Sequence, residues 1–285
     1  MRRALFAVTA VVVAGCALRG GAVAQQRPDP PPYRILVGND DGVRAPGIAA
    51  VAQILQAIGE VHIIGPAENQ SGKGHSIVTS EPVFREDITL PNGMRAVGLT
   101  ATPATAVNIA IRNIMKPRPD LVVSGINRGY NLAYSVYLSG TDGAAREGAI
   151  YGVLAIAASL AEEAMPRDVV AAAEEVLGVA RRVKQYGLPP GVFLNVNIPG
   201  VPQGGYKGYM VTTQARAKSG DESFAEMKHP SGRTIYWNVF KEGAGEASQG
   251  TDAWAVSQGY VSVTPMRLGE DDPTQMDTWR AIFKQ

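Results

Sequence analysis

The sequence of 285 residues has little of several features that would assign it to a class at once. It holds a single cysteine, so no intramolecular disulfide can form and the fold must be stabilised by core burial. Its 27 Lys and Arg against 26 Asp and Glu leave a formal charge of +1, which excludes a protein that binds nucleic acid through a broad basic face. With 45% hydrophobic residues and no internal repeat, it is neither a disordered chain nor a fibrous one.

The N-terminus carries an apolar run that is too short to span a membrane. Two arginines precede residues 4–15, which form this run, and residues 22–24 (Ala-Val-Ala) form a small-residue cleavage site. This order is typical of a secretory signal peptide, here residues 1–24, rather than of a membrane-spanning helix. We therefore expect no transmembrane span and a periplasmic or secreted protein that is cleaved after Ala24.

Two other interpretations of this N-terminus stay open. In the first, Val-Ala-Gly-Cys at 13–16, which resembles the lipobox of bacterial lipoproteins, directs lipidation of Cys16. In the second, the apolar run forms a buried N-terminal helix. We favour cleavage after Ala24, because the basic, apolar and small residues follow the signal-peptide pattern closely. Such cleavage removes three arginines, no acid and the only cysteine, and changes the formal charge from +1 to −2.

Composition shifts divide the rest of the chain. Residues 25–32 are rich in proline, which predicts an extended, disordered tether. Residues 33–285 read as one α/β domain, with a core at about 33–200 and an arm with a C-terminal extension at about 201–285. The 32 glycines and 19 prolines suit an α/β enzyme with many tight turns.

Short apolar runs alternate with helical patterns along the core. Residues 34–38 and 121–123 are apolar runs bounded by turn residues, the pattern of buried parallel strands, whereas apolar residues recur at helical spacing between 48 and 58. Further strands are expected at 61–64, 94–99, 154–160, 193–198 and 259–265, and further helices at 105–115, 141–151, 168–186 and 277–283. This alternation predicts a three-layer Rossmann-like sandwich with a mostly parallel sheet.

The second half is less regular and suggests contacts between subunits. Residues 205–240 alternate aromatic and polar positions around glycine-containing turns, which predicts a long β-hairpin arm. An arm and a terminal helix with little core of their own often dock onto a second copy of the chain. An extension of the sheet within one subunit fits the pattern equally well.

Asp40 and Asp41 follow the first predicted strand, at the edge of the sheet where parallel α/β proteins bind ligands. Two adjacent carboxylates repel each other unless a cation or a proton intervenes. Mg²⁺ and Mn²⁺ resolve that repulsion through oxygen ligands. The alternative is a solvated turn, since Asp-Gly is a common turn signal.

Two other loops carry polar residues without a Walker A spacing. One holds Asn69 and Ser71, and another runs from Ser124 through Asn127 to Ser139-Gly140-Thr141, just before a helix. A hydroxyl–glycine–hydroxyl step at a helix N-terminus suits an anion, because free N–H groups and the helix dipole both favour negative charge there. An ordinary N-cap by Ser139 or Thr141 is the alternative. The loops that follow the two apolar strands meet at the same sheet edge, which makes a shared site a better explanation than separate turns.

These residues resemble the survival protein SurE family of metal-dependent nucleotidases and acid phosphatases. The resemblance covers roughly residues 33–266 in order. The matching segments in this sequence are Asn39-Asp40-Asp41-Gly42-Val43, Ala45-Pro46-Gly47-Ile48, Pro66 with Asn69-Gln70-Ser71-Gly72, Thr102-Pro103, the run from Arg118 to Asn127, Tyr137 to Thr141, Glu147-Gly148, Asn195 to Pro199, and Gly250-Thr251-Asp252.

The resemblance implies a site and an assembly. One divalent ion per subunit, Mg²⁺ or Mn²⁺, would be bound by Asp40, Asp41, Ser71 and Asn127. The phosphate would be held by Ser139, Gly140 and Thr141, with Asn69 and Asn127 close by. The family fold is a Rossmann-type sheet whose C-terminal arm is exchanged between subunits, so we expect a homodimer or homotetramer.

The expected activity is metal-assisted hydrolysis of nucleoside 5′- and 3′-monophosphates or other small phosphomonoesters. Asp40 and Asp41 are the expected catalytic pair. Of the two, we expect Asp40 to orient or deprotonate the attacking water. An aspartyl-phosphate intermediate is not expected, because the Asp-x-Asp spacing is missing. The alternatives are a secreted broad-specificity acid phosphatase of the same fold and a periplasmic ligand-binding protein without catalysis. The chain departs from the family at Ala104-Thr105 and Gly129-Tyr130-Asn131, near the rim of the substrate site.

Overall fold

The computed structural model describes residues 31–216, 220–242 and 247–283, and the following account concerns these. The predicted signal peptide and most of the predicted tether lie outside them. The described strands are β1 (Arg34–Gly38), β2 (Glu60–Pro66), β3 (Arg85–Thr89), β4 (Arg95–Leu99), β5 (Leu121–Arg128), β6 (Leu154–Leu160), β7 (Val192–Ile198), β8 (Tyr209–Val211), β9 (Gly220–Lys228), β10 (Thr234–Glu242) and β11 (Val261–Arg267). The helices are α1 (Pro46–Leu55), α2 (Pro103–Ile109), the π-helical turn η1 (Ala110–Ile114), the 3₁₀ helix η2 (Ala133–Tyr137), α3 (Gly140–Ile150), α4 (Pro166–Tyr186), α5 (Asp252–Ser257), the 3₁₀ turn η3 (Pro273–Gln275) and α6 (Met276–Ile282).

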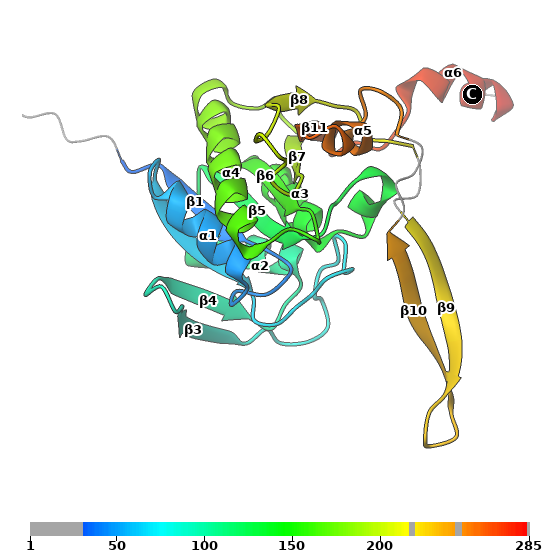
Figure 1. Ribbon diagram of the computed structural model, residues 1–285, viewed down its shortest axis with the longest axis horizontal. Helices are drawn as coiled ribbons and strands as arrows, with labels where there is room; N and C mark the ends of the chain where they lie inside the picture. Colours follow the sequence, from blue (N-terminus) through cyan, green and yellow to red (C-terminus); the bar gives the residue numbers. More distant parts are fainter. Residues whose placement is uncertain (1–30, 217–219, 243–246, 284–285) are drawn as a thin grey trace, which may run out of the picture. The chain divides into compact units, whose positions relative to one another are not determined.

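Nine of the strands form one sheet in the order β3-β4-β2-β1-β5-β6-β7-β11-β8 (Figure 1). The six strands from β4 to β7 in this order are parallel, whereas β3 runs antiparallel to β4 and β11 antiparallel to β7. The mostly parallel sheet predicted from the sequence is therefore confirmed. The apolar pattern does not predict β3, because this edge strand carries charged, exposed side chains of the kind that protect a sheet edge.

Two helical layers cover the sheet, which confirms the three-layer sandwich. Helices α1 and α4 lie side by side on one face, and α2 and α3 cover the other (Figure 1). Strand β1 shows why both layers are needed. Ile35 and Val37 pack into the core that α1 and α4 share, while Leu36 packs into the core of α2 and α3, and all three are fully buried. Among the described residues, no helix is both long and apolar enough to cross a membrane.

Strand β1 lies where the connections change direction. Its neighbours are β2 on one side and β5 on the other, so the loops after β1 and β5 lie next to each other at the carboxyl edge of the sheet, where a sheet of this topology leaves a crevice. Ligands of open α/β sheets bind at such a point. The fold thus places the loop that begins at Asn39 beside Asn127, at the end of β5.

The arm differs from the sequence expectation in its length. A two-stranded antiparallel hairpin is present, but it consists of β9 and β10 and begins at Gly220 rather than near residue 205. Residues 209–211 instead form β8, which pairs in parallel with β11 at the edge of the main sheet. Alternation of polar and apolar residues marks a strand without naming its partner, so the sequence could not separate β8 from the hairpin.

Candidate metal and phosphate site

The loop after β1 buries one of the two predicted aspartates. Asp40 is 3% exposed, and its Oδ1 accepts a hydrogen bond of 2.6 Å from the Thr141 hydroxyl at the start of α3. Burial raises the pKa of Asp40 to about 6; the Thr141 hydrogen bond offsets part of this increase, and the neighbouring Asp41 carboxylate adds to it. A cation at this position would favour the ionised form of both carboxylates.

Asp41 connects the three loops of the crevice. Its Oδ2 accepts a 3.2 Å hydrogen bond from the backbone N–H of Arg128, at the end of β5. Its Oδ1 lies 3.5 Å from Nδ2 of Asn69, in the loop after β2. Burial raises the pKa of Asp41, whereas the Arg128 N–H and guanidinium act in the opposite direction. Loops that are far apart in sequence therefore meet at this carboxylate.

The loop after β2 is fastened to both of its neighbours. The Gln70 N–H donates to the backbone oxygen of Asp40 at 2.7 Å, and the Gly74 N–H donates to that of Leu138 at 2.9 Å. Between these two anchors, the N–H of Ser71 donates to Oδ1 of Asn69 at 2.9 Å. Ser71 is exposed, and the described contacts link it to the aspartates through Asn69.

A β-bulge sets the position of Asn127. The pairing of β5 with β6 shifts register between Ser124 and Asn127, where one extra residue turns the end of β5 toward the crevice. Asn127 is 9% exposed, and its Nδ2 donates to the Gly129 oxygen at 2.8 Å. Its amide oxygen is therefore the atom that remains for a cation. No described hydrogen bond joins the Asn127 side chain to the other predicted site residues.

The start of α3 supplies the predicted phosphate-binding step. Ser139 caps the helix, and its Oγ accepts from the Asp142 N–H at 3.0 Å. A Cβ on Gly140 would lie 2.8 Å from Cβ of Asp40, so only glycine allows the helix to approach this closely. Thr141 is fully buried and donates to Asp40, which makes it a support for the carboxylate in this conformation.

Asp142 is the residue that sequence reasoning missed. It is fully buried beside Ser139, and neither carboxylate oxygen has a hydrogen-bond partner among the described residues. Burial raises the pKa of Asp142 to about 7; the Ser139 hydroxyl and the Arg146 guanidinium act against this increase, and Asp40 and Asp252 add to it. The Ser-x-x-Asp spacing of a capping box is the signal that could have drawn attention to it.

His75 and Glu147 form a second contact that the sequence did not predict. The His75 Nε2 lies 2.7 Å from Oε2 of Glu147, and Nδ2 of Asn108 donates to Glu147 Oε1 at 2.7 Å. Glu147 is 5% exposed and belongs to α3. This pair fastens the loop that carries Ser71 to the helix that carries the phosphate-binding step.

The predicted donor set consists of oxygen atoms only, which suits a hard divalent ion. Within the described ranges, no group of three or more His, Cys, Asp and Glu side chains is arranged to hold a metal. The predicted site therefore differs from metal sites whose ligands are all His, Cys, Asp or Glu side chains, because it also uses hydroxyl and amide oxygens. The fit rests on two carboxylates whose pKa values are raised, together with hydroxyl and amide oxygens.

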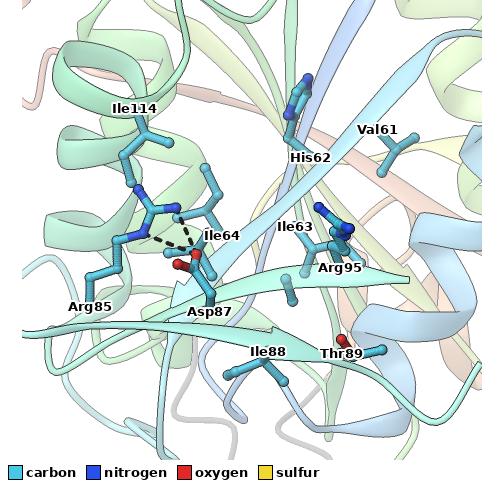
Figure 2. Close-up of a pocket in the computed structure, with 12 residues that line it drawn as sticks. Val61, His62, Ile63, Ile64, Arg85, Asp87, Ile88, Thr89, Arg95 and Ile114 are labelled. Atoms are coloured by element: carbon cyan, nitrogen blue, oxygen red, sulfur yellow. Dashed lines mark hydrogen bonds and ion pairs between the residues drawn. The ribbon is translucent and has the colours of Figure 1, made fainter. Parts of the chain in front are cut away.

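A separate groove lies away from these residues. Its volume is about 620 Å³, and none of the predicted site residues lines it. Figure 2 shows the lining side chains, which come from β2, β3 and β4 together with Ile114. Arg85 is paired with Asp87 across 2.7 Å, and His62 lies 3.1 Å from Glu60. The groove also holds Arg95, and Asp87 is the only carboxylate among the residues that line it, so we place no metal-dependent chemistry there.

The comparisons with known proteins agree with this geometry. Residues 35–221 match the family model described as Survival protein SurE. The chain belongs to the SurE family. The 5′-nucleotidase SurE 1 of Thermus thermophilus is 43% identical over 237 residues, which is 82% of this chain and 92% of that protein. The 5′-nucleotidase SurE of Geotalea daltonii is 39% identical over 82% of this chain and 93% of its own length.

A solved structure extends the agreement to three dimensions. The crystal structure of the SurE protein from Aquifex aeolicus matches with a TM-score of 0.74 at 36% identity, covering 88% of this chain and 99% of that one. The resemblance inferred from the motifs is thereby confirmed.

Asp142 should make the stability of this SurE protein depend on pH. Its pKa rises from 3.8 in the unfolded chain to about 7 in the folded one. The contribution of protonated Asp142 to the free energy of unfolding is therefore fully present below pH 3.8 and is lost as the pH rises through 7. Asp142→Asn stays neutral at every pH. Relative to wild type, we expect it to raise the free energy of unfolding at pH 8 by roughly 1–3 kcal/mol more than at pH 5.

Urea denaturation in EDTA at both pH values measures this difference. Asp87→Asn, in the exposed pair of Figure 2, is the matched control and should change stability equally at both pH values. An equal effect of Asp142→Asn at pH 5 and pH 8 would show that the buried carboxylate is not the cause.

Proposed function

We propose that this chain hydrolyses nucleoside 5′- and 3′-monophosphates to nucleoside and phosphate, with one Mg²⁺ or Mn²⁺ per subunit. The observation that carries the proposal is the meeting of Asp40, Asp41 and the N-terminus of α3 in one crevice at the carboxyl edge of the sheet. The names of the related proteins, 5′-nucleotidases, support the same reaction class.

Each group in the crevice has a role that its geometry suits. Asp40 and Asp41 would hold the ion, with Ser71 and the Asn127 oxygen as further ligands. The bound ion supplies a Lewis acid and lowers the pKa of a water molecule. Ser139 and the backbone N–H of Gly140, at the start of α3, would bind the phosphoryl oxygens, where they would stabilise negative charge as the ester bond breaks.

Asp40 is also the better of the two aspartates to orient and deprotonate the attacking water. Its carboxylate is the more buried of the two, and the Thr141 hydrogen bond fixes it beside the start of α3, where the phosphate would bind. The Thr141 hydroxyl donates to Oδ1 of Asp40, and the backbone N–H groups of Asp40 and Thr141 also bind this carboxylate and hold it in place.

Two other functions remain as alternatives with distinct outcomes. A broad-specificity acid phosphatase would release phosphate from nucleotides and from p-nitrophenyl phosphate at similar kcat/KM. A periplasmic ligand-binding protein would bind phosphate esters without turnover. It normally needs two similar lobes, whereas the described strands form one large sheet and one hairpin.

Asp41→Asn tests the ligand assignment. The substitution keeps the shape of the side chain but removes its charge, so we expect kcat/KM for AMP to fall by about 100-fold or more and Mn²⁺ affinity to fall with it. Phosphate release is measured with Mn²⁺, with Mg²⁺ and after EDTA, and Mn²⁺ binding by calorimetry. Full turnover of Asp41→Asn at limiting metal would refute the assignment, and Asp87→Asn should behave as wild type.

We also propose that the hairpin joins two copies of the chain into a homodimer or homotetramer. On one of its faces Ala225 lies opposite Trp237 and Met227 opposite Ile235. Trp237 is 66% exposed and Met227 52% exposed, which is a large apolar surface for a two-stranded ribbon to leave in water.

Removing these two side chains tests the assembly. We expect the double variant Met227→Ser, Trp237→Ser to have the mass of a monomer by light scattering, because the apolar face no longer drives association. Phe224→Ser is the matched control, since Phe224 is 61% exposed on the opposite face of the hairpin. A double variant with the mass of the wild type would contradict this use of the hairpin.

For the N-terminus we propose secretion with cleavage after Ala24. The mass of the mature protein recovered from bacteria then corresponds to a chain that starts at Gln25. A lipidated chain that starts at Cys16 would establish the lipoprotein alternative, and a chain that retains residues 1–24 would contradict export with cleavage.

A further inference from the structure

Two tyrosines stand exposed next to the phosphate-binding step. Tyr134 and Tyr137 belong to η2, and their side chains are 45% and 49% exposed. Residues three apart in a 3₁₀ helix lie directly above one another, so both rings occupy the same side of η2. Their centroids are 6.3 Å apart at an interplanar angle of 37°. Val136, between them in sequence, is fully buried and anchors the helix.

Short hydrogen bonds hold η2 in place at both ends. At its start, the N–H of Ala133 donates to Oδ2 of Asp252 at 3.0 Å, and Nε2 of Gln214 donates to the Ala133 oxygen at 2.6 Å. At its end, the Gly74 N–H donates to the Leu138 oxygen at 2.9 Å. The two aromatic rings are therefore carried by a fixed support, which reduces the entropy that a ligand would lose in ordering them.

The distance from the phosphate-binding step to these rings suits a nucleotide. Tyr137 precedes Ser139 by two residues, so their Cα atoms lie within about 7.6 Å of each other. In a nucleoside monophosphate one ribose separates the phosphate from the base. A phosphate bound at the start of α3 thus brings the base within reach of η2, where exposed aromatic rings offer a surface for stacking.

We propose that Tyr134 and Tyr137 form a base-stacking subsite that makes this chain prefer nucleotides to phosphate esters without an aromatic group. The proposal rests on the phosphomonoesterase function proposed above and adds the part of the substrate that the enzyme recognises. Stacking uses the face of the base and not its hydrogen-bonding edge. The subsite therefore accepts every base, and purines, with the larger face, better than pyrimidines.

AMP and ribose 5-phosphate make the decisive pair of substrates, because they differ only in the base. We expect wild type to show a kcat/KM for AMP about 10-fold or more above that for ribose 5-phosphate. The double variant Tyr134→Ala, Tyr137→Ala should lower the value for AMP to that for ribose 5-phosphate and leave the latter unchanged. The double variant Tyr134→Phe, Tyr137→Phe keeps the rings and should keep the preference.

Binding provides a readout that does not need turnover. AMP affinity measured by calorimetry should fall about 10-fold in the double alanine variant and should be unchanged in Tyr186→Ala, a control at the end of α4 that is 77% exposed. If AMP affinity falls in the double alanine variant and not in Tyr186→Ala, but wild type releases no phosphate from either ester, the subsite stands and the proposed function fails.

Three results would overturn the subsite. Wild type could treat the two esters equally, or the double alanine variant could lose activity on both in the same proportion. The double alanine variant could also lose its oligomeric mass by light scattering, which would mean that a second copy of the chain covers the two rings.

Discussion

The hydrogen bond from Thr141 to Asp40 joins the two halves of the site. The two residues are 101 positions apart in sequence, yet their side-chain oxygens lie 2.6 Å apart. The bond requires α3 to approach the loop after β1 so closely that residue 140 must be glycine. Next to it, Asp41 joins the Asn69 loop and the end of β5 to the same place.

The crevice concentrates negative charge where water is scarce. Burial raises the pKa values of Asp40, Asp41 and Asp142, so the folded chain without a cation carries carboxylates that are destabilised in their ionised form. Such destabilised groups are common at functional sites, where stability is exchanged for activity. A divalent ion held by Asp40 and Asp41, as we propose, would reverse this balance at those two carboxylates and would let a chain of near-zero net charge attract a phosphate ester.

Much of the fold followed from the sequence, because buried parallel strands and their covering helices have distinct apolar patterns. Strand β1 and helix α3 lie within a residue of their predicted bounds. The exposed edge strand β3 did not follow, since it has no apolar face, and the short apolar strand β8 could not be separated from the hairpin. Their pairing depends on partners that are remote in sequence, and local pattern carries no information about those partners.

The sequence by itself determined the family, the sandwich and the oxygen-rich residue types of the site, because motif order and hydrophobic period are local properties. Only the tertiary structure decided that Thr141 supports Asp40, that Asp142 is buried without a partner, and that Tyr134 and Tyr137 share one side of η2. Burial, partner choice and the turn of a 3₁₀ helix arise when distant segments pack together. The packing of distant segments therefore sets the pKa values of the buried carboxylates and decides which aromatic rings are exposed.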